Sequence, residues 1–187
     1  MQLTCKELPN GIRIVHQEIP HTRLVHCGFI LNIGSRDEDQ EQEGLAHFWE
    51  HMAFKGTQKR KTFHILNRLE SLGGELNAYT TKEKVCFYAS VLKDHYDKAA
   101  ELLYDITFHS TFPDKQIERE RQVILEEMAM YRDSPDDAIQ DELDALVFEH
   151  HALGRNILGT EETVSNFHHQ DFIEFISSRL DTSQLVF

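Results

Sequence analysis

The 187 residues include 19 lysines and arginines against 32 aspartates and glutamates, a formal net charge of −13, and 40% are hydrophobic. That apolar content is enough for the core of one globular domain. The acidic balance argues against nucleic acid or an anionic membrane surface as a partner, because both are bound by clustered Lys and Arg. Apolar runs fall well short of the roughly 20 residues of a membrane-spanning helix. The N-terminus resembles no secretory signal, so we predict a cytoplasmic protein.

The first third of the chain predicts β-strands. Leu3–Leu8 and Arg13–Gln17 flank Asn10-Gly11, a dipeptide typical of a hairpin turn. The stretch Leu24–Ile33 is apolar apart from His26 and Asn32, which is the pattern of a strand buried on both faces. A sheet is therefore expected to begin early in the chain.

The rest of the chain predicts helices with two more strands among them. Carboxylates at 37–43 precede the apolar-periodic stretch 44–54 and favour the start of a helix there. Strands are expected over 76–81 and 85–91, and further helices over 62–72, 94–109, 114–131, 136–150 and 169–180. This order favours an α+β fold, with helices packed on one face of a mainly antiparallel sheet.

The chain ends on apolar residues, Leu185-Val186-Phe187, which read as the opening of a strand. A natural domain rarely stops on its most apolar residues. We therefore interpret residues 1–187 as a single domain of a longer protein, cut near Phe187.

The most informative stretch is His47-Phe48-Trp49-Glu50-His51. On a helix His47 and His51 lie about 40° apart and one turn from each other, so both imidazoles can reach one cation. Glu50 lies about 60° to the other side of His47, close enough to touch a metal-bound water. This HxxEH order is typical of inverzincin zinc sites. With 12 histidines in the chain, such a pair also arises by chance, and its spacing alone leaves both interpretations open.

A catalytic zinc site needs a third protein ligand, and the helix expected over 114–131 offers candidates. Ile117, Ile124, Met128 and Tyr131 are expected to form the buried stripe of this amphipathic helix. Glu120 and Glu127 are seven residues apart and border that stripe. Spacing alone does not establish either of them as a ligand.

Three motifs follow one another along the chain: His47–Thr57 (HFWEHMAFKGT), Gly73–Thr80 (GGELNAYT) and Glu118–Met128 (ERERQVILEEM). Together they resemble the pitrilysin/insulinase family of zinc peptidases. Within this family the chain is similar to the catalytic β subunit of mitochondrial processing peptidase and its small bacterial relatives. The likeness continues through Gly34–Glu38 and Leu153–Gly159 to the end of the chain.

The resemblance implies a set of roles for residues of this chain. His47, His51 and Glu127 would bind one zinc ion per chain, and Glu50 would be the general base of a metalloendopeptidase. Glu120 would be a supporting residue close to the metal. Asn77, Ala78 and Thr80 would belong to an edge strand that pairs with an extended substrate peptide.

The resemblance also implies a larger assembly, because members of the family close two halves of this fold around the peptide. We expect the partners to be peptide substrates and a C-terminal half or homologous subunit, with self-association of the exposed interface as a further expectation. A bacterial origin is expected as well. The alternative is a non-catalytic zinc-binding or scaffold subunit of the same fold, or a fragment that is inactive without its other half.

Overall fold

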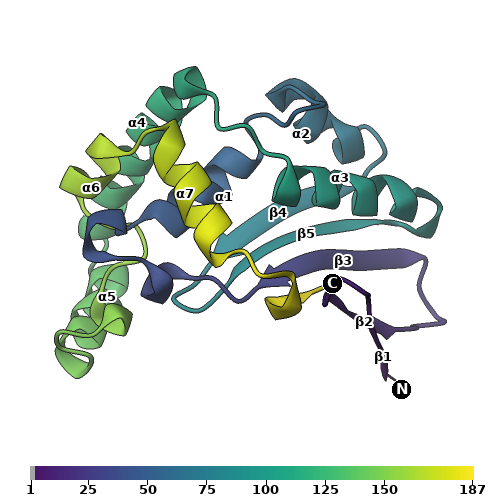
Figure 1. The fold of residues 1–187 in the computed structure, drawn as a ribbon, viewed down its shortest axis with the longest axis horizontal. Coiled ribbons are helices and arrows are strands. Elements are labelled where there is room, and N and C mark those ends of the chain that lie inside the picture. The colour runs from purple at the N-terminus through teal and green to yellow at the C-terminus, as the bar shows by residue number, and fades with distance from the viewer. Residues whose placement is uncertain (1–2) are drawn as a thin grey trace.

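The computed structural model describes residues 3–187, without the side chain of Asp137 (Figure 1). The strands are β1 (Leu3–Glu7), β2 (Arg13–Gln17), β3 (Leu24–Leu31), β4 (Glu75–Thr80), β5 (Val85–Leu92) and β6 (Leu185–Val186). The helices are α1 (Leu45–Ala53), α2 (Thr62–Glu70), α3 (Tyr96–Phe108), α4 (Asp114–Arg132), α5 (Pro135–Val147), α6 (Glu161–Asn166) and α7 (His169–Arg179). Apart from the short α6, each of these helices overlaps one that the sequence predicted.

The strands form one six-stranded sheet in the order β1-β2-β6-β3-β5-β4. All neighbours are antiparallel except β2 and β6. The β1–β2 hairpin is the one that Asn10-Gly11 predicted: Gly11 has a φ of +89°, and the backbone N–H of Ile12 donates to the Asn10 side chain at 3.3 Å. Glycine suits this turn because it adopts positive φ without steric cost.

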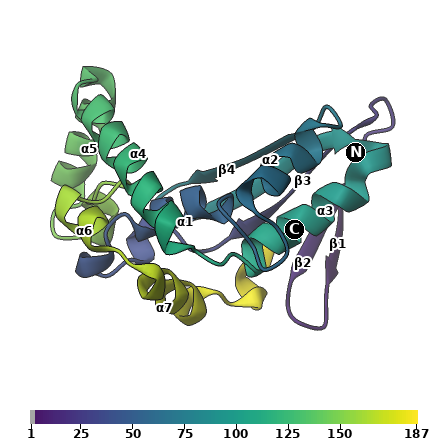
Figure 2. The ribbon, with the colours of Figure 1, turned by 90° about the horizontal axis from the view of Figure 1, so that it is seen from above.

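Helices cover one face of the sheet. Helix α3 packs on β3 and β5, and α2 packs between α3 and β4; seen from above, α2 and α3 lie over the sheet (Figure 2). On β5 the alternate residues Val85, Phe87, Ala89 and Val91 point to this face and are at most 1% exposed, as the two-residue period of a strand requires. The predicted α+β class and the arrangement of its layers are confirmed.

The prediction that Leu24–Ile33 is buried on both faces is wrong. Leu24 and Ile30 on β3 are 52% and 40% exposed. Ile30 borders a hollow of about 780 Å³ on the sheet, which Cys86 and Phe187 also line. The sequence pattern describes the strand's own side chains, and it carries no information about whether another element covers them.

Asp105 on α3 joins that helix to the loop that follows α1. It is 1% exposed, accepts a hydrogen bond from the Thr57 hydroxyl at 2.8 Å, and pairs with Arg60, which also binds Glu101 at 2.7 Å. We expect Asp105→Ala to lower the free energy of unfolding by about 3 kcal/mol, because the Arg60 charge, little exposed itself, loses its buried partner. Urea denaturation followed by circular dichroism measures this.

The matched control for that change is Glu101→Ala, since Glu101 binds the same guanidinium from a position 39% exposed. Removing an exposed ion-pair partner costs about 1 kcal/mol or less. Equal losses for the two variants would contradict a special role for the buried carboxylate.

Candidate metal centre

Helix α1 carries both histidines of the HxxEH motif. It begins after Gly44, whose φ of +93° turns the chain into the helix. Its apolar side chains are completely buried: Leu45, Ala46, Phe48, Trp49, Met52 and Ala53. Packing on these sides leaves His47 and His51 to face α4, with their ring centroids 4.6 Å apart.

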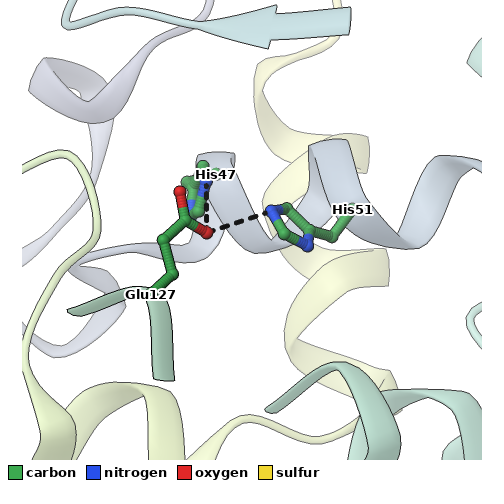
Figure 3. A group of neighbouring side chains, drawn as sticks. All are labelled: His47, His51 and Glu127. Carbon is green, nitrogen blue, oxygen red and sulfur yellow. Dashed lines mark ion pairs between the residues drawn. The ribbon is translucent and has the colours of Figure 1, made fainter. Parts of the chain in front are cut away.

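Glu127 on α4 meets both imidazoles. Its Oε2 atom lies 3.7 Å from Nε2 of His47 and 3.5 Å from Nε2 of His51, and dashed lines in Figure 3 join this one oxygen to both rings. Within residues 3–187, these three side chains form the group whose ligand atoms all lie within 4.8 Å of one another. The structure therefore brings together the three residues that the sequence resemblance assigned to a metal.

This donor set fits a zinc ion. Zinc bonds to imidazole nitrogen and carboxylate oxygen are about 2.0–2.2 Å long, so two ligand atoms of a tetrahedral site lie roughly 3.4 Å apart. The two nitrogen-to-oxygen distances above are within a few tenths of an ångström of that value. Two imidazoles and one carboxylate also leave a fourth position for water, as in catalytic zinc sites.

His47 has the protonation state that metal binding requires. It is 8% exposed, and burial together with the neighbouring His51 lowers the pKa of His47 to about 3. Near neutral pH the ring is therefore uncharged, and an uncharged imidazole offers the nitrogen lone pair that a metal needs.

Glu50 points from α1 toward β4. Its Oε2 atom accepts a hydrogen bond from the Thr80 hydroxyl at 2.6 Å. Burial raises the pKa of Glu50 above its ordinary value, although the bond from Thr80 acts in the opposite direction. A carboxylate that is partly shielded from water and fixed by one donor is suited to accept a proton.

Glu120 lies about two helical turns before Glu127 and contacts the other side of His51. Its Oε2 atom is 3.3 Å from Nδ1 of His51, and its Oε1 atom is 2.7 Å from Nζ of Lys55. Burial raises the pKa of Glu120, but the bonds from His51 and Lys55 outweigh it and hold the pKa below its ordinary value. An ionised Glu120 fixes the His51 tautomer whose Nε2 faces Glu127.

We expect Glu120→Gln to weaken zinc binding about 10- to 100-fold, the usual effect of removing a partner that orients a metal-bound histidine. Titration of the metal-free protein with zinc against a competing chelator measures the affinity. Glu118→Gln is the control, because Glu118 lies on the same helix and binds Arg121 rather than His51. An unchanged affinity for Glu120→Gln would contradict the orienting role.

Two parts of this neighbourhood were not predicted correctly from the sequence. Lys55 was not singled out, although it follows His51 by four residues, just beyond the end of α1, and its charge complements Glu120. Tyr131 was assigned to the buried stripe of α4, but it is 42% exposed, while Ile117, Ile124 and Met128 are buried. That stripe ends before Tyr131 because the last turn of α4 extends beyond the core.

The other predicted residues lie on β4, next to α1. This strand is the last in the sheet order, so one of its edges pairs with no strand among the described residues. Asn77 is exposed and Ala78 half-buried, and the backbone N–H of Ala78 donates to the Asn77 side chain at 2.8 Å. Thr80 instead points its hydroxyl at Glu50.

Comparison with known proteins gives matches over nearly the whole chain. Residues 13–161 match the sequence model described as Insulinase (Peptidase family M16). An uncharacterised zinc protease of Bacillus subtilis (strain 168) is 43% identical over 164 residues, which cover 88% of this chain and 39% of that protein. The β subunit of mitochondrial-processing peptidase from Mus musculus is 37% identical over 187 residues, 99% of this chain and 37% of that protein.

The same fold occurs among solved structures. The crystal structure of a protease from Helicobacter pylori superposes with a TM-score of 0.93 at 22% identity, over 99% of this chain and 45% of that one. The chain thus spans about two fifths of the length of the curated relatives above. In the part of the chain that is described, no helix combines the length and apolar character needed to cross a membrane.

Proposed function

This chain belongs to the insulinase (M16) family of peptidases, as its motifs predicted, and we propose that it is the zinc-bearing part of a metalloendopeptidase that cleaves extended peptides. The observation that supports this is the convergence of His47, His51 and Glu127, with a separate carboxylate, Glu50, beside them. The relatives named as zinc proteases support zinc as the metal.

The proposed chemistry divides between the metal ligands and the base. His47, His51 and Glu127 would hold one zinc ion, which supplies a Lewis acid for the scissile carbonyl and lowers the pKa of water. Glu50 accepts the proton of the attacking water and returns it to the leaving amine. Thr80 orients the Glu50 carboxylate through its hydrogen bond.

The edge of β4 is the proposed binding place for the substrate backbone. An extended peptide can add to this edge by main-chain hydrogen bonds, as in other cases of strand addition. In the structure the N–H of Ala78 donates to the neighbouring Asn77. A substrate carbonyl at this N–H would replace the Asn77 side chain, so both residues would touch the peptide.

We propose that zinc binding is local to this chain, whereas efficient turnover needs a further domain. All three ligands and Glu50 lie on α1 and α4, but the relatives are more than twice as long as the matched segment. The proposed partners are therefore the remainder of a longer chain or a homologous subunit. Self-association of this chain and a cytoplasmic location stay predictions.

The experiment combines metal analysis with a cleavage assay on the purified chain. We expect elemental mass spectrometry of the purified protein to find one zinc ion per chain. We also expect slow cleavage of a quenched-fluorescence peptide, which stops when a chelator removes the zinc. A chain that binds no zinc would contradict the proposed site. A chain that binds zinc without any cleavage, alone or with its partner subunit, would favour the non-catalytic zinc-binding alternative.

A further inference from the structure

Two segments that take no part in the proposed chemistry meet at the N-terminal end of α1. One is Gly34–Glu38, which precedes the helix, and the other is Leu153–Gly159, which lies more than a hundred residues later in the chain. Glu38 bonds to N–H groups at the start of the helix that carries the HxxEH motif, and Leu158 and Gly159 pack against Glu43 and Gly44 just before it.

Glu38 bonds to this first turn directly. It is 4% exposed, and its two carboxylate oxygens accept hydrogen bonds from the N–H groups of Gly44 at 2.9 Å and Ala46 at 2.7 Å. The first N–H groups of a helix lack partners within the helix, and the residue at the N-cap normally supplies a side chain for them. Here the N-cap is Gly44, which has none, and Glu38 performs this role from six residues earlier.

Arg155 fixes the segment that carries Glu38. Its Nη1 atom donates to the backbone carbonyl of Glu38 at 2.7 Å, and its Nε atom lies 3.4 Å from the Glu43 carboxylate. Thr163 adds a hydrogen bond from its hydroxyl to the Glu43 carbonyl at 2.7 Å. Glu38 thus bonds to the start of α1, while Arg155 and Thr163, from later in the chain, bond to Glu38 and Glu43.

Close packing leaves this end of α1 little freedom. A Cβ atom on Gly44 would lie 2.4 Å from the Leu158 carbonyl oxygen, and one on Gly159 would lie 2.1 Å from the Glu43 carbonyl oxygen. Neither position has room for a larger residue without a shift of the backbone. The backbone of Leu158–Gly159 is therefore packed directly against the backbone of Glu43–Gly44.

The position of α1 decides the geometry of the metal centre. The helix carries two of the proposed ligands, whereas the third, Glu127, belongs to α4. A shift of α1 away from α4 would lengthen the distances from Glu127 to both histidines. Ala46, one of the two residues bonded to Glu38, is the immediate neighbour of His47.

We propose that Glu38 and Arg155 are positioning residues, which fix the start of α1 and thereby hold His47 and His51 at ligand distance from Glu127. The inference rests on the proposed zinc site and concerns how tightly that site binds its metal. A carboxylate suits this place because negative charge is stabilised at a helix N-terminus.

If Glu38 had a purely structural role, its substitution would lower only the stability of the fold. If it positions the metal ligands, its substitution also lowers the affinity for zinc. Burial raises the pKa of the Glu38 carboxyl above its ordinary value, against the effect of the N–H groups of Ala46 and Gly44, so the charged form, whose two oxygens accept both N–H bonds, is costly to bury. The neutral amide of Glu38→Gln avoids that cost but can accept only one of the two N–H bonds. We therefore expect a larger change in zinc affinity than in stability.

The test measures zinc affinity by chelator competition and apo-protein stability by urea denaturation, for the parent chain and three variants. We expect Glu38→Gln to weaken zinc binding about tenfold, at the lower end of the range for groups that orient metal ligands. Arg155→Lys, which leaves the buried carboxylate in place and can replace only one of two contacts, is expected to weaken it about threefold. Glu41→Gln, an exposed residue of the same loop, is the control and keeps the parent affinity.

Zinc affinities within experimental error of the parent, for both Glu38→Gln and Arg155→Lys, would overturn the inference, whatever happens to the urea midpoint. If Glu38→Gln does not fold, Arg155→Lys decides the matter alone. A parent chain that fails to bind zinc would contradict the proposed function itself. The two failures are therefore distinguishable.

Discussion

Glu50→Gln is expected to keep bound zinc and to lose peptide hydrolysis by about 10²- to 10⁴-fold, the usual contribution of a general acid–base group. The amide has nearly the same shape and can still accept the Thr80 hydrogen bond, so the fold and the metal ligands stay in place. It cannot accept a proton from water. The measurement is the rate of cleavage of a quenched-fluorescence peptide, normalised to the zinc content of each preparation.

The control for this change is Glu126→Gln, which removes the same charge from an exposed position on α4. It should hydrolyse the peptide at the parent rate. Parent-like hydrolysis by Glu50→Gln at equal zinc content would rule out Glu50 as the base. A rate that falls only in proportion to lost zinc would place Glu50 among the metal-binding residues instead.

Removal of a proposed ligand should act on the metal itself. We expect His47→Ala and Glu127→Ala each to weaken zinc binding by more than about 100-fold, a larger effect than the loss of a residue that only orients a ligand. Each change leaves two protein ligands of the three that a catalytic zinc site uses. Metal analysis after dialysis against a weak chelator, with zinc retained by the parent chain, measures the difference.

Glu126→Ala is the matched control for Glu127→Ala, since the two glutamates are neighbours on α4 and only Glu127 reaches the imidazoles. It should retain zinc. Equal zinc content in the two variants would show that the metal, if bound, lies elsewhere. Circular dichroism of the apo variants separates ligand loss from unfolding.

The sequence located the site better than it described its surroundings. The spacing of His47 and His51 is a local property of one helix, so it could be recognised directly. Glu127 lies on another helix, and spacing alone could not separate it from Glu120; only the family resemblance did. In the structure one carboxylate faces both Nε2 atoms, and the other faces Nδ1 of His51.

Features that depend on distant contacts were missed. The carboxylates before α1 predicted a helix start, but the sequence could not show that Glu38 alone among them bonds to Gly44 and Ala46, because the loop must fold back for this contact. Helix α6 was missed because its six residues are too few for a clear period. The burial of β3 was predicted wrongly because the sequence of a strand does not show whether another element packs on each of its faces.

The order of the strands also constrains the order in which the protein folds. Strands β1 and β2 are made first, yet in the sheet they are joined to β3 through β6, which consists of Leu185 and Val186. During synthesis more than 160 residues must therefore be added after the hairpin before β2 can pair with β6. Contacts this distant in sequence form slowly, because the loop between them must close first. Docking of the hairpin is thus a late event, well after the helix with His47 and His51 has emerged from the ribosome.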